Sequence, residues 1–277
     1  MKIGIAIFAY NRPSHLKRLL IALEDYKIKK ISAFVDGPKN ARDKLIQEQI
    51  FFMLKNNKKI KISIFLRKKN IGLAKSLMLG LSYMSKKYPF FIALEDDVIP
   101  YKNFFKFINL NCKKFEKKQR VGALCGYQLP EINKKAKSEI CSTYFDFFIP
   151  WGWGTWSVVW KEFENFKIKK KNINDSKNLN IFFKKFLLKA IKKKKNSIWS
   201  AKFILFNLLN NYRFIYPTHS LTKNIGFDGS GVNSKITNQL IVTDGKNKKI
   251  NFSKIYLNPQ LQKIQHNTLK KKMGLFY

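Results

Sequence analysis

The chain has 277 residues, of which 45% are hydrophobic and 15% aromatic, which excludes a disordered protein and is enough to bury a full core. No apolar run approaches the roughly 20 residues of a membrane-spanning helix, and three cysteines without metal-ligand spacing favour a reduced, cytoplasmic setting. The net charge of +38 is spread in lysine-rich patches, which indicates compositional bias first, attraction to an anionic membrane second and nucleic-acid binding third.

The first half of the chain alternates short apolar runs with segments whose apolar residues recur at helical spacing. The apolar start is followed by Tyr10-Asn11-Arg12-Pro13 instead of a signal-peptide cleavage site, so we interpret it as a first strand. Predicted strands cover 2–8, 31–35, 60–65, 90–94 and 121–125, and predicted helices cover 13–23, 41–54, 70–85 and 103–115. This alternation predicts an α/β fold with a mostly parallel, doubly wound sheet and helices on both faces. Right-handed crossovers then place Asn11, Asp36 and Asp97 along one edge of that sheet.

The second half has a different sequence pattern, with aromatic, glycine-rich and lysine-rich segments, which suggests an α+β portion. An aromatic, glycine-spaced segment runs from Phe145 to Trp156, and a loop with three glycines runs from Asn224 to Asn233. Helical spacing predicts a lysine-flanked helix over 179–191 and another over 199–209. The tail alternates short strand-like runs with lysines. Since no repeat or long linker is present, we expect one continuous domain with halves 1–126 and 127–277.

Three adjacent carboxylates, Glu95, Asp96 and Asp97, follow the apolar run Phe90–Leu94, which suits a strand buried on both faces. The chain has only 17 acidic residues against 55 basic ones, and burying unpaired carboxylates is unfavourable. At the carboxyl end of a strand they would lie where open α/β sheets bind ligands. Their hard oxygens suit Mg²⁺ or Mn²⁺, which would bridge nucleotide phosphates. The alternative is a solvated acidic turn.

Other polar residues near the same edge have two interpretations each. Arg12 either lies at a helix entry or meets a base or phosphate. Asp36 either caps a turn or accepts a hydrogen bond from uracil or ribose. The segment Asn70 to Lys75 would present backbone amides and an ammonium group at a helix start, where anions bind.

The aromatic segment and the glycine loop also leave alternatives open. The tryptophans either build an aromatic core or form a wall for sugar rings. The loop has no Walker signature, but its glycines would let it close over phosphates as a lid. The histidines His15, His219 and His266 lack metal-ligand spacing, and none is assigned a role.

Taken in order, these segments resemble GT-A nucleotide-sugar glycosyltransferases, similar to bacterial family-2-like enzymes and to the N-acetylglucosaminyltransferase I group. The resemblance spans about residues 3 to 234 and rests on an ordered set of motifs. They are Phe8–Pro13, Val35–Gly37, Asn70–Ala74, Glu95–Asp97, Asp146–Trp156 and Asn224–Gly231. The resemblance implies a GT-A, Rossmann-like fold in which 1–126 binds the nucleotide sugar and 127–277 binds the acceptor.

The resemblance also implies roles for single residues. The metal, Mn²⁺ or Mg²⁺, would be held chiefly by Asp97 with Glu95 beside it, and Asp96 would lie near the ribose. Donor contacts are implied for Asn11, Arg12, Asp36, Asn70, Lys75, Gly229 and Ser230. The donor would be a nucleotide-diphosphate sugar, with a UDP-sugar favoured. The acceptor would be a glycan or a lipid-linked molecule, as in cell-surface polysaccharide synthesis.

Such relatives invert the anomeric centre with an aspartate base that follows a tryptophan. Here the segment reads Ser197-Ile198-Trp199-Ser200-Ala201-Lys202 and lacks that aspartate, so Asp146 and Asp228 are the nearest candidates. The resemblance therefore predicts a metal-dependent, inverting glycosyltransferase.

Two alternatives to this activity remain. One is a GT-A-fold nucleotidyltransferase, although such enzymes carry a glycine-rich basic loop directly after the first strand, and this sequence has none there. The other is a non-enzymatic, basic nucleic-acid-binding protein. We also predict that the 179–191 helix docks on an anionic inner membrane face, where a lipid-linked acceptor would lie. The alternative is that this helix packs on the core.

Overall fold

The computed structural model of the protein describes residues 1–116, 120–136, 139–167, 199–230, 236–242 and 248–272. Its strands are β1 (Ile3–Ala9), β2 (Lys30–Val35), β3 (Lys61–Leu66), β4 (Phe90–Glu95), β5 (Val98–Pro100), β6 (Val121–Cys125), β7 (Glu139–Phe145), β8 (Trp153–Trp156), β9 (Arg213–Pro217), β10 (Thr222–Asn224) and β11 (Lys249–Ile255). Its helices are α1 (Pro13–Asp25), α2 (Ala41–Lys55), α3 (Leu73–Lys87), α4 (Phe104–Lys114), α5 (Pro130–Lys135), α6 (Ser157–Asn165), α9 (Trp199–Leu209) and α10 (Pro259–Lys272).

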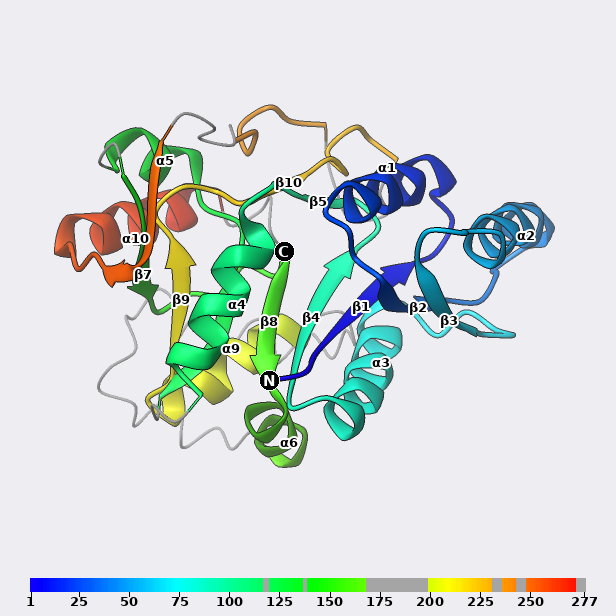
Figure 1. Ribbon diagram of the computed structural model, residues 1–277, viewed down its shortest axis with the longest axis horizontal. Coiled ribbons are helices and arrows are strands. Elements are labelled where there is room, and N and C mark those ends of the chain that lie inside the picture. The colour runs from blue at the N-terminus through cyan, green and yellow to red at the C-terminus, as the bar shows by residue number, and fades with distance from the viewer. Residues whose placement is uncertain (117–119, 137–138, 168–198, 231–235, 243–247, 273–277) are drawn as a thin grey trace.

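One sheet of nine strands runs through the described chain, in the order β11-β7-β9-β6-β8-β4-β1-β2-β3 (Figure 1). Strands β1 to β4 pair parallel to one another, and β6 and β9 point the same way. Strands β7, β8 and β11 run in the opposite direction. A separate antiparallel ladder joins β10 to β5. The predicted α/β fold with a mostly parallel sheet is therefore confirmed.

The predicted elements of the first half form as their hydrophobic pattern indicates, each within three residues of its expected ends, and the short strand β5 is an element that the sequence did not predict. Helix α1 begins at Pro13, whose fixed φ suits a first helical position, and it buries Leu16, Leu19, Leu20 and Leu23. Right-handed crossovers place α1 and α2 on one face of the strands and α3 on the other (Figure 1). This arrangement brings the loops after β1, β2 and β4 to the same edge of the sheet.

The second half contains elements that the sequence pattern did not define. Part of the aromatic segment forms β8, which inserts between β4 and β6 with Trp153 opposite both Ala93 and Cys125. The strand-like interpretation of the tail fits β11 but is wrong for α10, because two of that helix's buried positions are the polar Gln265 and Thr268. Helix α9 matches its predicted range, and the predicted 179–191 helix lies outside the described residues.

The tryptophans mostly build core. All five of them are buried. Trp153 stacks on Trp199 with ring centroids 5.5 Å apart, and Phe203 packs against both rings. Trp160 contacts the same cluster. Within the described ranges, none of the helices has the length and apolar character that crossing a membrane requires.

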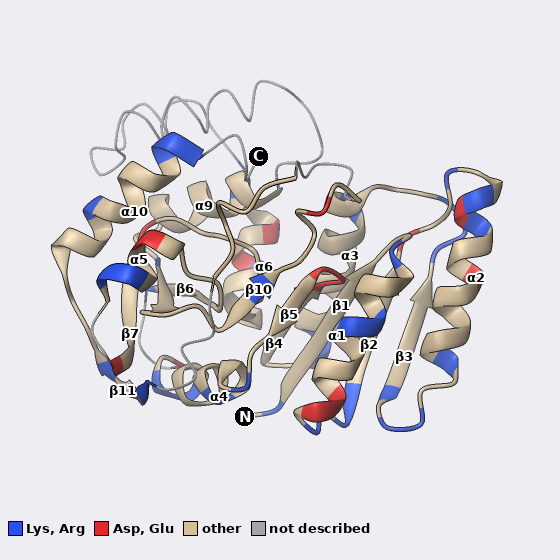
Figure 2. Cartoon of the chain, turned by 90° about the horizontal axis from the view of Figure 1, so that it is seen from above, with Lys and Arg blue, Asp and Glu red and all other residues tan. Residues whose placement is uncertain are grey.

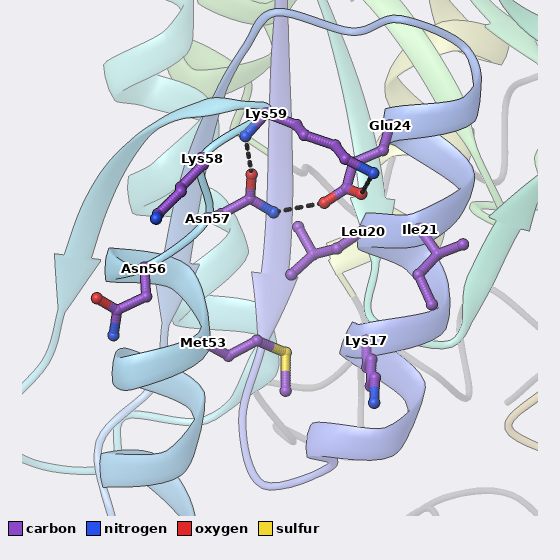
Figure 3. A pocket seen from close by; sticks show the side chains of 9 residues that line it. All are labelled: Lys17, Leu20, Ile21, Glu24, Met53, Asn56, Asn57, Lys58 and Lys59. Atoms are coloured by element: carbon purple, nitrogen blue, oxygen red, sulfur yellow. Dashed lines mark hydrogen bonds and ion pairs between the residues drawn. The ribbon is translucent and has the colours of Figure 1, made fainter.

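A shallow hollow between α1 and α2 lies away from the acidic triplet, and Figure 3 labels its lining residues. At its rim the Lys59 ammonium is 3.2 Å from the Glu24 carboxylate, and the Asn57 amide donates to that carboxylate at 2.7 Å. Glu24 is near the end of α1, which leads back from the carboxyl end of β1. The hollow is therefore at the amino edge of the parallel strands, opposite the end of β4.

Candidate functional site

The acidic triplet lies where β4 ends, at the carboxyl edge of the parallel strands. Glu95 is the last residue of β4, and the backbone amide of Asp96 donates to the carbonyl of Phe8 in β1 at 2.9 Å. Strand β5 begins directly after Asp97, so the triplet forms a tight turn (Figure 2). Asp96 and Asp97 are only 2% and 8% exposed, and Glu95 is half-buried. The fold thus holds two of the three carboxylates away from water at the edge where open α/β sheets bind ligands.

Arg12 is the basic partner of this triplet. It is the N-cap residue of α1, directly after the loop that follows β1. Its guanidinium forms an ion pair with Asp96 and lies 2.9 Å from the Asp97 carboxylate. Burial alone would lower the pKa of Arg12, but the charges of Asp97 and Asp96 outweigh it and raise that pKa. Arg12 therefore stays charged and neutralises part of the acidic turn.

The remaining electrostatics of the turn favour a further cation. Burial, followed by the charges of Asp97 and Asp96, raises the pKa of Glu95 to about 8. Burial also raises the pKa of Asp96 to about 7, although the charge of Arg12 opposes this. Asp97 Oδ1 is buried and has no hydrogen-bond partner among the residues that the structure describes. A buried carboxylate oxygen without a partner, among acids that resist ionisation, fits a hard divalent cation such as Mg²⁺ or Mn²⁺.

The protein would supply only part of such a cation's ligands. Among the described residues, no three His, Cys, Asp or Glu side chains form a group suited to hold a metal. A divalent cation with few protein carboxylates completes its shell with water and substrate phosphates. The geometry therefore suits a cation that is shared with a phosphate-bearing ligand.

The loop after β10 crosses directly over this turn. β10 pairs with β5, which places Asn224 opposite Val98, and the backbone amide of Ile225 donates to the carbonyl of Asp97 at 2.8 Å. A Cβ atom at Gly226 would lie 2.2 Å from Asp97 Oδ2 and 3.0 Å from Arg12 Nη1. Only glycine therefore allows the backbone to lie this close to the carboxylate. Gly231, the last residue of the predicted lid, lies outside the described residues.

Two further contacts hold the loop in place. His15 Nε2, from the first turn of α1, lies 3.1 Å from Asp228 Oδ2. The backbone amide and the hydroxyl of Ser230 donate to Asp228 Oδ1 at 3.0 and 2.6 Å. These hydrogen bonds lower the pKa of Asp228. Gly229 lies between them with a φ of +85°, which favours glycine. The predicted base Asp228 and donor residues Gly229 and Ser230 thus belong to the same edge as Asp97.

Asp36 and Asn70 lie at this edge, but their polar groups hold the backbone together. The Asp36 carboxylate accepts hydrogen bonds from the amides of Gly37, Ile71 and Gly72 at 2.9, 3.0 and 2.9 Å. The Asn70 side chain donates to the carbonyl of Gly37 at 3.0 Å. These bonds fasten the end of β2 to the segment that opens α3. The predicted donor residue Lys75 is exposed on the first turn of that helix.

Asn11 takes part in a network that sequence reasoning missed. Its side chain donates to Asp43 Oδ1 at 3.0 Å, the Tyr10 hydroxyl donates to the same carboxylate, and so does the backbone amide of Lys39 at 3.1 Å. Asp43 is buried in the first turn of α2. Burial and Asp43 together raise the pKa of Tyr10. The network fixes the shape of the loop between β1 and α1.

Two sequence signals point to the missed residues. Asp43 follows Asn40 by three residues, the spacing of a helix start in which the Asn40 side chain accepts from the Asp43 amide at 2.9 Å. His15 follows Arg12 by three residues, so both face the same side of the first turn of α1. Neither signal indicates a chemical role by itself, because the role depends on contacts with segments that are distant in the sequence.

The structure does not bring Asp146 to this site, which corrects its assignment as a base. Asp146 follows β7, which runs antiparallel to β9 and therefore ends at the amino edge of the parallel strands. β7 is also four strands from β4 in the sheet, about 19 Å at the usual strand spacing. There Asp146 lies 3.9 Å from Arg213. The error arose because β7 reverses direction within a mostly parallel sheet.

Trp151 is the tryptophan that contacts the loop. Its ring packs edge-on against Phe227 with centroids 5.2 Å apart and against Tyr127 with centroids 4.6 Å apart. Its carbonyl accepts a hydrogen bond from the Thr222 hydroxyl at 2.7 Å. Trp151 is only 9% exposed, so in this structure it packs beneath the loop as part of the protein interior.

No family model and no curated protein matches the chain. Solved structures do resemble it. The S. aureus TarS 1–349 structure has a TM-score of 0.47 and 13% identity, over 80% of this chain and 59% of that one. The mannosyltransferase PcManGT from Pyrobaculum calidifontis, in complex with GDP-Man and Mn²⁺, has a TM-score of 0.40 and 10% identity, over 76% of this chain and 72% of that one.

A Bacillus anthracis protein described as a glucose-1-phosphate thymidylyltransferase has a TM-score of 0.35 and 11% identity, over 70% of this chain and 84% of that one. The similar structures thus include a mannosyltransferase and a protein described as a thymidylyltransferase. This chain spans only 59% of the TarS structure. Since these TM-scores are below 0.5, the likenesses decide neither substrate nor reaction.

Proposed function

We propose that the protein is a glycosyltransferase that moves a sugar from a nucleotide-diphosphate donor to a hydroxyl group of a glycan or lipid-linked acceptor. One observation supports this above all: a glycine loop crosses a buried acidic turn at the carboxyl end of β4, where Asp97 Oδ1 has no partner within the described part of the chain. A diphosphate needs a hard cation and nearby backbone amides to neutralise its charge. The turn offers carboxylates for such a cation, and the loop brings its backbone to the same edge.

In this proposal the divalent cation, Mn²⁺ or Mg²⁺, is held chiefly by Asp97, with Glu95 beside it. When bound, such a cation stabilises the charge that develops on a departing diphosphate. Asp96 lies toward the ribose and is oriented by Arg12, with which it forms an ion pair. The planar guanidinium of Arg12 presents several donors in a geometry that suits phosphate oxygens.

The donor's nucleotide lies along the ends of β1 and β2 in this proposal, with a UDP-sugar favoured. Asp36 and Asn70 act by holding that edge rigid, because their side chains bind backbone groups there. Asn11 shapes the neighbouring loop through Asp43. Lys75 reaches the donor from the first turn of α3, and the loop residues Gly229 and Ser230 lie beside the diphosphate.

Asp228 is the proposed catalytic base. Its lowered pKa keeps it ionised at neutral pH, which is the state that accepts a proton. The acceptor hydroxyl gives its proton to Asp228 as its oxygen attacks the anomeric carbon. The bond from that carbon to the diphosphate breaks on the opposite face, so the configuration inverts. The first residues of α9, Trp199, Ser200 and Ala201, provide no carboxylate for this step.

The acceptor belongs to cell-surface polysaccharide synthesis in this proposal, and the half 127–277 binds it while 1–126 binds the donor. A lipid-linked acceptor would bring the protein to the anionic inner face of a membrane. The net charge of +38 supports such contact, since each basic residue near an anionic surface contributes about 1 kcal/mol. The lysine-rich helix predicted for this role, 179–191, lies outside the described residues.

A thermal-shift screen of nucleotide sugars with and without Mn²⁺ tests the proposal. A donor that binds the native state raises the melting temperature by mass action. We expect at least one UDP- or GDP-sugar to do so only with Mn²⁺, and we expect Asp97→Asn to abolish the shift. The control Asp25→Asn removes an exposed carboxylate at the end of α1 and should leave the shift intact. Binding of random oligonucleotides without any response to nucleotide sugars would refute the enzyme assignment.

A further inference from the structure

The guanidinium of Arg12 occupies the space between the two buried carboxylates of the acidic turn. It forms an ion pair with Asp96 and lies 2.9 Å from Asp97 Oδ2. Its side chain is only 16% exposed, so little water screens its charge. Gly226 closes the remaining side, since a Cβ there would lie 3.0 Å from Arg12 Nη1. Arg12 is therefore a fixed positive charge inside the region where Asp97 would bind a divalent cation.

A divalent cation and the guanidinium cannot both bind these carboxylates without strong repulsion. A cation on Asp97 would lie within a few ångströms of a second positive charge in a partly buried environment, where Coulomb repulsion is large. Breaking one of the two Arg12 ion pairs relieves that repulsion, but it leaves a buried guanidinium short of acceptors, which is also unfavourable. The guanidinium therefore lowers the affinity of the apo site for the metal, although the carboxylates still attract it.

We propose that Arg12 is an internal counter-cation that competes with the metal and is drawn away by the donor's diphosphate. The metal then binds tightly only together with the nucleotide. This inference rests on the proposed function, because it assigns the same turn to a divalent cation and a nucleotide-diphosphate donor. Arg12 is a positioning residue here, since it makes tight binding of the metal depend on binding of the nucleotide.

The diphosphate suits this exchange because it replaces the acceptors that Arg12 loses. Phosphate oxygens accept paired hydrogen bonds from a guanidinium as carboxylates do. Arg12 is also the N-cap residue of α1, where no side chain caps the helix, so its surroundings already favour an anion. A diphosphate at this end of α1 would bind Arg12 and leave Asp97 free for the metal.

Thermodynamic linkage makes the proposal measurable. If the nucleotide raises the affinity for the metal, the metal raises the affinity for the nucleotide by the same factor. Removing Arg12 should therefore reduce both the effect of the nucleotide on metal affinity and the effect of the metal on nucleotide affinity. A purely structural role for Arg12 would change stability without changing the ratio of the two metal affinities.

The experiment measures Mn²⁺ binding by calorimetry or electron paramagnetic resonance, with and without UDP and, in parallel, GDP. Each hydrogen bond to a charged group is equivalent to roughly a tenfold change in affinity or more, so we expect Arg12→Met to bind Mn²⁺ alone about tenfold more tightly than the wild type. The rise in Mn²⁺ affinity on adding nucleotide should shrink by about the same factor. Arg18→Met removes an exposed arginine from the same helix and should match the wild type.

Two results separate the inference from the proposed function. If Asp97→Asn and the wild type bind Mn²⁺ equally with nucleotide present, the metal site and the proposed function are both wrong. If Asp97 is required but Arg12→Met binds Mn²⁺ no more tightly than the wild type, only the counter-cation role is wrong. Should Arg12→Met fail to fold, Arg12→Lys keeps one charge but loses the paired geometry, and the same ratio of affinities decides the question.

Discussion

The closest contact between the glycine loop and the acidic turn gives the sharpest prediction, for the substitution Gly226→Ala. The added Cβ would lie 2.2 Å from Asp97 Oδ2, whereas a carbon and an oxygen approach to about 3.3 Å. The loop must therefore move by about 1 Å. That movement breaks the hydrogen bond from Ile225 to the Asp97 carbonyl, a loss of about 1 kcal/mol, and overpacking adds about 1–3 kcal/mol.

We expect Gly226→Ala to lower the melting temperature by about 3–7 °C, given a loss of roughly 2–4 kcal/mol in a chain of this size. Mn²⁺-dependent nucleotide binding should weaken by at least about tenfold, since the loop no longer lies on the turn. Scanning calorimetry and isothermal titration measure the two effects.

Gly122→Ala is the control for lost stability in this experiment. Its added Cβ would lie 1.6 Å from Asn207 Oδ1, near the start of β6 and so at the amino edge of the parallel strands. It should lower the melting temperature but keep Mn²⁺-dependent nucleotide binding. Wild-type affinity in a folded Gly226→Ala protein would refute the view that the loop is part of the site.

Three further predictions concern neighbouring residues. Asp228→Asn should bind donor normally but turn over about 10²–10⁴ times more slowly with a soluble acceptor; unchanged turnover would exclude Asp228 as the base. Tyr10→Phe should lower the free energy of unfolding by about 1–2 kcal/mol at pH 7. Because the hydrogen bond from Tyr10 lowers the folded-state pKa of Asp43, that stability is present above about pH 4 and is lost as pH falls through the folded pKa. In urea unfolding, the difference between Tyr10→Phe and wild type should therefore be smaller at pH 3 than at pH 7. His15→Gln should speed proteolysis of the loop after β10, since Asp228 loses its contact with α1; equal cleavage rates would contradict the role of His15.

The first half of the fold could be predicted because its signals are local. Apolar runs such as Phe90–Leu94 and helical spacings such as Leu16 to Leu23 define elements without reference to the rest of the chain. Much of the second half could not, although α9 was predicted, because β8 contains two tryptophans and a glycine whose placement depends on the strands at either side. Helix α10 was also missed, because polar residues occupy part of its buried face and so the apolar residues do not recur at helical spacing.

The residues of the candidate site also fall into two groups, those that local sequence indicates and those that depend on contacts between distant segments. Arg12, Asp96 and Asp97 were found because they follow strands whose carboxyl ends share an edge. Asp146 was misassigned because strand direction cannot be read from the residues that follow a strand. The contacts of His15 with Asp228, and of Gly226 with Asp97, join segments more than 100 residues apart. Such contacts arise only when β10 pairs with β5.

The insertion of β8 has a consequence for the order of assembly during synthesis. β8 comes from residues 153–156, yet it pairs with β4 on one side and with β6 on the other. When a ribosome has released residues 1–126, these two strands still have unpaired, apolar edges that attract other chains. The nascent chain can close this sheet only after Trp156 has emerged, so a fragment that ends at residue 126 should aggregate, although it contains the whole acidic turn.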